Sequence, residues 1–416
     1  MSHSYMTTIG EIAEVFDGPH ATPKKLPSGP YFLSISSLDK GRLDLTKSAF
    51  LSEEDFKKWT KRVTPKEGDL LFSYETRLGE AALMPAGVRA CLGRRMGLLR
   101  FNKAKVMPEY ALYAYLSPAF QQTIKANTLT GATVDRLSIS EFPNFPIRIP
   151  PLEEQKKVAD LLGSIDKKIA LNNSINTELE AMAKTLYDYW FVQFDFPDIN
   201  GKPYKTSGGK MEYNATLKRE IPVGWYASNI LSLADLFGGG TPTKTKHEYW
   251  DGSIPFFTPT DSDKNIYSLN TQDSITELGL KNSSTRLFEK NTIFITARGS
   301  VGRLALNAVP MAMNQSCYAL RAKKGTSFAF LYFLTKELIH HLEVKATGSV
   351  FNSIISNDIE YTYLALPEDN NLIDKYAKKT ELAFAKIELL TKENQHLIAL
   401  RDWLLPLLMN GQVTVK

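Results

Sequence analysis

Residues 147–155 read Ile-Arg-Ile-Pro-Pro-Leu-Glu-Glu-Gln, a short β-type run that two prolines end before a helical stretch begins. Proline is favoured in the first helical turn, and acidic side chains there stabilise the helix dipole, so the segment predicts a strand-to-helix junction. Ile147-Arg148-Ile149-Pro150 is matched by Leu364-Ala365-Leu366-Pro367, 217 residues later (367 − 150). A junction that occurs twice predicts two globular parts, each followed by a helix.

Further matches extend this repeat over most of the chain. Short β-type runs in both halves are broken by Gly, Pro, Asn and Ser, which is typical of a mixed α/β globule with long loops. Three more pairs of segments match in the same order: Gly68-Asp69-Leu70-Leu71-Phe72 with Lys290-Asn291-Thr292-Ile293-Phe294, Leu99-Arg100 with Leu320-Arg321, and Thr130-Gly131-Ala132-Thr133-Val134 with Thr347-Gly348-Ser349-Val350-Phe351. Their offsets differ by only a few residues, which indicates a duplication with loop insertions.

Two seams of residues spaced seven apart follow the junctions. They consist of Val158, Ile165, Asn172, Leu179 and Leu186, flanked by apolar residues that include Met182, and of Tyr376, Ala383, Leu390, Leu397 and Leu404, flanked by residues that include Leu400. Heptad spacing is typical of helices that pack on one another, and about 40 residues at 1.5 Å each give a helix of about 60 Å. Packing of each helix on its own globule is the alternative. Asn172 is either a register-setting residue or a solvated misfit.

Composition narrows the class of protein. The chain has 416 residues, of which 43% are apolar and 11% aromatic, enough for two or three domains with real cores. Lys and Arg (50) slightly exceed Asp and Glu (45), so a polyanionic partner is compatible but not required. Cys91 and Cys317 form no Cys-x-x-Cys motif, which argues against zinc and disulfides. With no apolar signal core and no run of about 18 apolar residues, we expect a protein of the reducing cytoplasm.

Motifs of catalysis are missing from the sequence. It contains neither the Asn-Pro-Pro-aromatic quartet of an adenine methyltransferase nor a Gly-x-x-x-x-Gly-Lys-Ser/Thr loop for ATP. Phe237-Gly238-Gly239-Gly240-Thr241 only begins like a cofactor loop and is better interpreted as a turn. Glu343-Val344-Lys345 lacks the partner of a nuclease motif, and Asp261-Ser262-Asp263 fits a solvated loop better than a metal site. We therefore expect no catalytic residues and no metal site.

Several segments resemble the specificity subunits of type I restriction-modification systems. Gly239-Gly240-Thr241-Pro242 resembles the family's glycine-rich entry motif, and Tyr31-Phe32-Leu33-Ser34-Ile35 its aromatic strand. Residues 147–155 resemble the junction from globule to helix, and Trp190–Phe196 the exit from the central helix. The second junction departs from the pattern, because Pro367-Glu368-Asp369-Asn370-Asn371 lacks the second proline and the glutamine. The resemblance covers essentially the whole chain.

This resemblance implies an α+β fold. Two pseudo-symmetric mixed α/β target-recognition domains are separated by a pair of long antiparallel coiled-coil helices. The boundaries that follow are target-recognition domain 1 at 1–150, a central helix at 151–192, a linker at 193–209, target-recognition domain 2 at 210–366, and a C-terminal helix with its tail at 367–416.

The function that the resemblance implies is sequence-specific recognition of double-stranded DNA without catalysis. Each recognition domain is expected to read one half of a bipartite site, while the helices set the spacer and dock two methyltransferase subunits. Restriction subunits that translocate DNA then join the complex. S-adenosylmethionine, ATP and Mg are expected on those partner subunits and not on this chain. A scaffold that joins proteins without touching DNA is the alternative, but it leaves the loop-bearing globules unexplained.

Candidate DNA contacts are polar or basic residues in predicted loops at corresponding places of the repeat, because such side chains read base edges and hold phosphates. In the first globule they are Lys24, Lys25, Ser36, Tyr74, Thr76, Arg77, Arg94, Arg95, Thr133 and Arg136. In the second they are Thr241, Lys244, Lys246, Thr260, Asp261, Arg298, Ser300, Asn314, Gln315 and Asn352.

Overall fold

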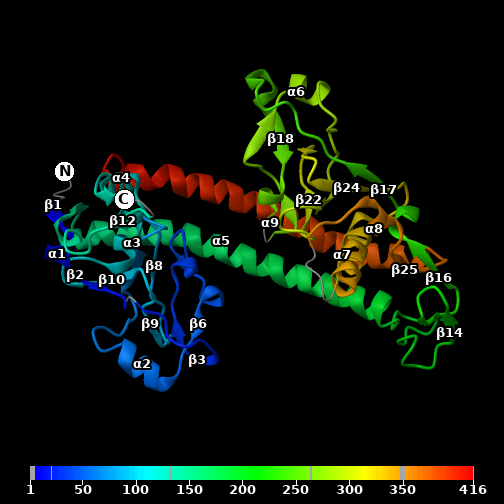
Figure 1. Ribbon diagram of the computed structural model, residues 1–416, viewed down its shortest axis with the longest axis horizontal. Helices are drawn as coiled ribbons and strands as arrows, with labels where there is room; N and C mark the ends of the chain where they lie inside the picture. The colour runs from blue at the N-terminus through cyan, green and yellow to red at the C-terminus, as the bar shows by residue number, and fades with distance from the viewer. Residues whose placement is uncertain (1–4, 20, 131–133, 263–264, 347–351, 416) are drawn as a thin grey trace. The chain divides into compact units, whose positions relative to one another are not determined.

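The chain folds into two compact units (Figure 1). The structure is a computed structural model that describes residues 5–19, 21–130, 134–262, 265–346 and 352–415. The first unit comprises Met1–Ile169 and His396–Lys416, and the second comprises Ala170–Gln395. Each unit therefore holds one globular part and one section of each long helix.

A four-stranded antiparallel sheet forms the centre of the first unit, in the order β2 (Ala13–Asp17), β10 (Met96–Phe101), β7 (Leu70–Ser73) and β8 (Ala81–Leu83). Side chains alternate between its faces, so Leu70 and Phe72 enter one core while Leu71 enters another. The first of these cores also contains residues of α3 (Pro108–Leu116) and α4 (Pro118–Ala126).

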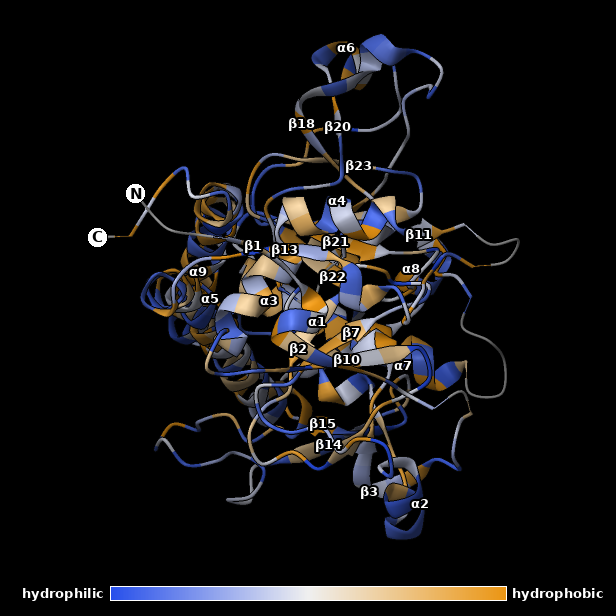
Figure 2. Cartoon of the chain, turned by 90° about the vertical axis from the view of Figure 1, so that its left-hand side faces the viewer, coloured by the Kyte–Doolittle hydropathy of each residue, from blue (hydrophilic) through white to orange (hydrophobic). Residues whose placement is uncertain are grey.

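The other elements of the first unit are short. They are β1 (Tyr5–Thr8), α1 (Ile9–Ile12), β3 (Leu26–Phe32), β4 (Leu38–Asp39), β5 (Arg42–Leu43), β6 (Ala49–Phe50), α2 (Glu53–Trp59), β9 (Ala90–Cys91), β11 (Thr128–Leu129), β12 (Arg136–Leu137) and β13 (Pro146–Ile149). Most of the α2 ribbon has hydrophilic colours in Figure 2, which agrees with its acidic first turn and with Lys57 and Lys58.

The second unit repeats this plan. Its main sheet runs in the order β17 (Ala234–Gly238), β24 (Cys317–Ala322), β21 (Ile293–Thr296), β22 (Leu304–Asn307) and β19 (Tyr267–Ser268), and the buried helix α7 (Phe328–Lys345) contributes to the same core. The other elements are β14 (Met211–Asn214), β15 (Arg219–Pro222), β16 (Trp225–Asn229), β18 (Trp250–Phe257), β20 (Asp273–Ile275), α6 (Glu277–Lys281), β23 (Ala312–Met313), α8 (Ser356–Glu360) and β25 (Tyr363–Pro367). The β14–β15 hairpin precedes the repeated part.

Strand pairing corrects one of the matches made from the sequence. Leu99 pairs with Leu70, whereas Leu320, the counterpart of Leu99, pairs with Ile293. Leu70 therefore corresponds to Ile293 and not to Thr292, an offset of 223 (293 − 70) in place of 222. The similarity of Phe72 to Phe294 was misleading, because a slip of one residue moves a side chain to the opposite face of a strand.

The long helices are α5 (Leu152–Tyr187), which continues as a π-helical turn over Asp188–Val192, and α9 (Asn371–Met409). Within the second unit, the Nδ2 of Asn172 donates to the Oδ1 of Asn394 at 2.9 Å. The hydroxyl of Tyr376 donates to the carbonyl of Ala183 at 3.0 Å. The residue numbers of the partners run in opposite directions, so the helices are antiparallel there.

The residues of the two seams differ in how deeply their side chains are buried. Val158, Ile165, Asn172, Tyr376 and Leu390 are buried, and Leu179, Leu186, Ala383, Leu397 and Leu404 are partly buried. The flanking residues Met182 and Leu400 are exposed, so their expected place beside the seam was wrong. Both side chains lie on the solvent-facing side of their helices. The seven-residue period identifies the seam itself but does not say which of the residues beside it are buried.

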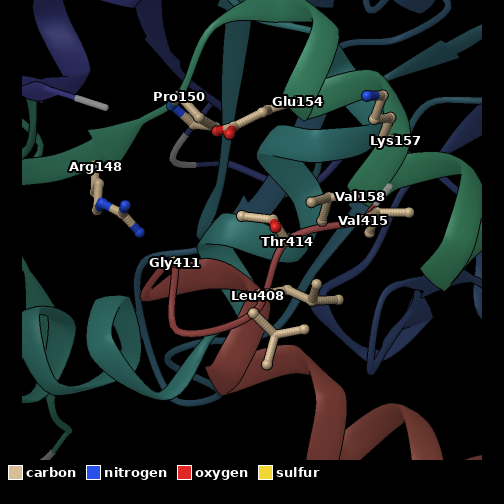
Figure 3. Close-up of a pocket in the computed structure, with 10 residues that line it drawn as sticks. Arg148, Pro150, Glu154, Lys157, Val158, Leu408, Gly411, Thr414 and Val415 are labelled. Carbon is tan, nitrogen blue, oxygen red and sulfur yellow. The ribbon is translucent and has the colours of Figure 1, made fainter. Parts of the chain in front are cut away.

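The C-terminal segment packs against the first strand-to-helix junction, both within the first unit (Figure 3). The Nη1 of Arg148, on β13, donates to the carbonyl of Met409 at 2.6 Å. Leu408 and Met409 share a core with Val158 and Ile149. The end of α9 is therefore part of the first unit's hydrophobic core.

Candidate nucleic-acid interface

Three segments of the first unit meet at one end of its sheet. The hairpin loop Tyr74–Glu80 joins β7 to β8, and the turn Gly93–Met96 leads into β10. The amide of Tyr74 donates to the carbonyl of Arg95 at 3.2 Å, and the amide of Leu137 donates to the carbonyl of Tyr74 at 2.8 Å. We call these segments, Tyr74–Glu80, Gly93–Met96 and Arg136–Leu137, the first loop cluster.

The second unit builds the same arrangement from corresponding residues. The hairpin loop Ala297–Arg303 joins β21 to β22, and the turn Asn314–Cys317 leads into β24. The amide of Ala297 donates to the carbonyl of Ser316 at 2.8 Å, and the amide of Ile354 donates to the carbonyl of Ala297 at 3.0 Å. These segments, Ala297–Arg303, Asn314–Cys317 and Ile354, are the second loop cluster.

Glycines hold each turn close to the first strand of its sheet. The amide of Gly18 donates to the carbonyl of Met96 at 2.8 Å, and the amide of Gly239 donates to the carbonyl of Cys317 at 3.3 Å. A Cβ at Gly18 would lie 2.4 Å from the carbonyl oxygen of Gly93, and a Cβ at Gly239 would lie 2.0 Å from that of Asn314. The glycine-rich segment at 238–240 thus permits a close backbone approach.

Charged side chains of the first loop cluster are partly tied to one another. Arg95 pairs with Glu75, and the Nη1 of Arg77 donates to the carbonyl of Ile35 at 3.1 Å. Arg94, Thr76 and Arg136 are exposed, and Ser36 is partly exposed. Thr76 and Arg95 have φ angles of 68° and 71°, a left-handed conformation that is uncommon outside glycine and clusters at functional sites.

The second loop cluster also presents a mixture of exposed and tied side chains. Arg298 and Ser300 are exposed on the hairpin loop. On the turn, the Oδ1 of Asn314 accepts from the amide of Ser316 at 3.0 Å, while the Oε1 of Gln315 accepts from the hydroxyl of Thr241. The cluster therefore combines an exposed cation with an oriented carboxamide.

Several of the predicted contacts lie outside the loop clusters or have a structural role. Lys24, Lys25 and Lys244 are exposed on other loops, Thr260 and Asn352 are exposed nearby, and Thr133 lies outside the described residues. The Nζ of Lys246 lies 3.1 Å from the hydroxyl of Tyr249, and this hydrogen bond raises the pKa of Lys246. Tyr74 is buried, and burial raises its pKa, so its ring supports the loop from within.

Asp261 has a structural role as well. Its Oδ2 accepts from the amide and the hydroxyl of Thr258, at 2.8 and 2.7 Å, and its Oδ1 accepts from the amide of Gln272 at 2.8 Å. These bonds hold the 3-10 turn Pro259–Asp261 that follows β18. Within the described ranges, no group of three His, Cys, Asp or Glu side chains is arranged to hold a metal ion.

Sequence reasoning missed three charged residues of the clusters, namely Glu75, Glu80 and Arg303. Glu75 pairs with Arg95, and the Nη1 of Arg303 donates to the carbonyl of Ser262 at 3.2 Å. All three lie in hairpin loops from which other residues had been selected, so membership of these loops was a usable signal. The selection was weighted toward basic, amide and hydroxyl side chains, with Asp261 as its one acidic member, and it therefore passed over the carboxylate of Glu75.

Comparison with known proteins connects this geometry to a family. The model of the type I restriction modification DNA specificity domain matches residues 3–181 and 222–397, once for each repeat. The chain belongs to this family. The two specificity-domain matches contain both loop clusters, since Tyr74–Leu137 falls inside the first matched range and Ala297–Ile354 inside the second.

This specificity-domain chain matches relatives over most of their length. It is 26% identical over 416 residues to the type I restriction enzyme MjaIX specificity subunit of Methanocaldococcus jannaschii, covering 99% of this chain and 90% of the relative. It is 23% identical over 403 residues to the HindI specificity subunit of Haemophilus influenzae, covering 84% and 87%.

A solved structure shows the same fold. The type I restriction-modification S subunit from M. genitalium superimposes with a TM-score of 0.58 and 16% identity, covering 98% of this chain and 96% of that one. The α+β fold with two related mixed α/β parts and long helices is thereby confirmed. Among the described helices of this specificity-domain chain, none is both long and apolar enough to cross a membrane.

Proposed function

We propose that the chain is the DNA-specificity subunit of a type I restriction-modification complex and carries out no catalysis itself. Residues 1–150 and 210–366 act as recognition domains that each read one half of a bipartite site in double-stranded DNA. The helices at 151–192 and 367–416 connect them, with a linker at 193–209. The observation that carries the proposal is the pair of equivalent loop clusters, each at the same end of a related sheet.

The composition of the clusters supports contact with DNA. Arginine and amide side chains read base edges in the major groove, and further cations hold phosphates. Arg94 and Arg136 are exposed in the first cluster, and Arg298 and Gln315 in the second. Because each cluster belongs to its own compact unit, each can be altered without disturbing the other.

Apolar rows on the helices support docking of partner proteins. Within the second unit, Leu382 and Leu389 are seven residues apart on α9 and are 78% and 58% exposed, and Leu171 and Met182 of α5 are 55% and 67% exposed. Exposed apolar residues gathered along a helix mark interaction surfaces. We assign these rows to two methyltransferase subunits, which would bind S-adenosylmethionine. Restriction subunits that join later would use ATP and Mg.

A mobility-shift experiment tests the proposal. The purified chain, its methyltransferase subunits and both together are mixed with short duplexes that contain or lack the methylated sequence mapped in the host genome. We expect a specific shift with the assembled complex that the methyltransferase subunits alone do not give. Assembly of a stable protein complex with no preference for the mapped sequence would support the scaffold alternative and contradict the proposal.

A further inference from the structure

The two turns in the loop clusters are equivalent but carry different side chains. In each turn the fourth amide donates to the first carbonyl, from Met96 to Gly93 at 3.3 Å and from Cys317 to Asn314 at 3.2 Å. Arg94 and Gln315 occupy the second position of their turns, an offset of 221 residues (315 − 94), and both side chains are exposed. The same backbone position therefore presents a guanidinium in one unit and a carboxamide in the other.

The neighbouring hairpin loops confirm that the positions correspond. Both loops have seven residues, Tyr74–Glu80 and Ala297–Arg303, and in each the first amide donates to the adjoining turn. The sixth residue of each is a glycine with nearly the same φ, 86° at Gly79 and 84° at Gly302. The second residue of the loop carries opposite charges in the two units, since it is Glu75 in the first and Arg298 in the second. The units thus share a backbone frame and differ in its polar side chains.

Side-chain chemistry relates this difference to base choice. A guanidinium matches the O6 and N7 acceptors of guanine, and a carboxamide matches the N6 donor and N7 acceptor of adenine. Arg95 is unsuited to this contact because its guanidinium pairs with Glu75. Gln315 is oriented by Thr241, whose hydroxyl donates to its Oε1. That oxygen keeps a second lone pair for a base, and the Nε2 keeps its donors.

We propose that Arg94 selects a guanine in the half-site read by the first unit, and that Gln315 selects an adenine in the half-site read by the second. This inference rests on the proposed function and adds base identity to it. It assigns the different preferences of the two units to one equivalent position.

Reciprocal substitutions test the assignment. The full chain, R94Q or Q315R is assembled with its methyltransferase subunits and S-adenosylmethionine, and the complexes methylate a duplex library with randomised half-sites that is then sequenced. We expect R94Q to weaken the preference for guanine at one position of one half-site by roughly tenfold, within the range for a bidentate contact. We expect Q315R to replace adenine by guanine at one position of the other half-site.

Internal and matched controls separate the possible failures. K58Q removes an exposed positive charge from the outer face of α2 and should leave both half-sites unchanged. If the unsubstituted complex yields no bipartite motif, the proposed function is contradicted and the inference with it. If the motif is present but unchanged in both variants, or if activity falls equally on all sequences as for a phosphate contact, only the assignment of Arg94 and Gln315 is overturned.

Discussion

Burial of single residues decides the reactivity of the two thiols. Cys91 and Cys317 are buried, and desolvation raises the pKa of each to about 12. Since the thiolate is the reactive species, we expect iodoacetamide to leave both unmodified in the folded protein at about pH 8 and to modify both after unfolding in urea. Mass spectrometry measures the adducts. Rapid labelling of either cysteine under native conditions would contradict the burial described here.

The same raised pKa values set the direction of a pH effect. An unfolded thiol titrates near pH 8.5, so between about 8.5 and 12 the folded state holds protons that the unfolded state has lost. The contribution of the two thiols to the free energy of unfolding is complete below about pH 8.5. It decreases as the pH rises from about 8.5 to about 12. Labelling of the folded protein should accordingly remain slow up to about pH 10.

Asp166 joins three helices of the first unit through its carboxylate. It accepts from the hydroxyl of Tyr113 at 2.7 Å and from the Nη1 of Arg401 at 2.9 Å. D166N replaces the charged carboxylate that accepts both bonds with a neutral carboxamide. We expect the free energy of unfolding, measured with urea, to fall by roughly 1–3 kcal/mol. D160N on the same helix is the control, because the exposed Asp160 forms a surface ion pair with Lys156, and its loss should cost less than about 1 kcal/mol. Equal losses for the two variants would argue against the role given to Asp166.

At the scale of elements, local patterns predicted the fold better than the site. The long helices follow from seven-residue periodicity and the proline-led junction, which are properties of adjacent residues. The loop clusters depend on bonds between distant segments, such as that from the Tyr74 amide to Arg95, and composition does not encode these. For the same reason the match of Phe72 to Phe294 was off by one residue, because cross-strand partners alone fix which face a strand residue occupies.

Asn172 lies in a polar layer between the long helices of the second unit. It is fully buried, and its Nδ2 donates to Glu393 and Asn394, each at 2.9 Å. We expect N172A to cost roughly 1–3 kcal/mol, because it removes the donor from the buried Oδ1 of Asn394 and from the partly buried carboxylate of Glu393. The double variant N172L/N394L removes polar groups from both helices and should recover much of this loss. Urea unfolding measures both, and a neutral N172A would show that the layer does not stabilise the pair.

At the scale of the whole molecule, the proposed function makes helix length a determinant of the DNA spacer. One heptad is inserted after Asn176 in α5 and one after Leu390 in α9, which are opposed because the Nδ2 of Asn176 lies 3.4 Å from the hydroxyl of Thr391. Seven residues add about 10.5 Å, or about three base pairs at 3.4 Å each. We expect selection of a spacer about three base pairs longer, or loss of tight binding if the added DNA twist is not accommodated.

A library of duplexes with different spacers measures this outcome. The insertion in α5 alone is the control, because it shifts the seam out of register and should prevent normal pairing of the helices. If the doubly extended chain still binds methyltransferase and keeps the original spacer undiminished, helix length does not set the distance.

The contact between Arg148 and Met409 has a consequence for biosynthesis. The first unit needs residues 396–416, so its core lacks Leu408 and Met409 while the 226 residues from 170 to 395 are being translated (395 − 169). At roughly 5–20 residues per second, the ribosome leaves this nascent globule incomplete for about 10–45 s. During that interval its apolar patch around Ile149 and Val158 is open to chaperones, and a premature stop codon near the 3′ end of the message would damage the part of the protein that was made first.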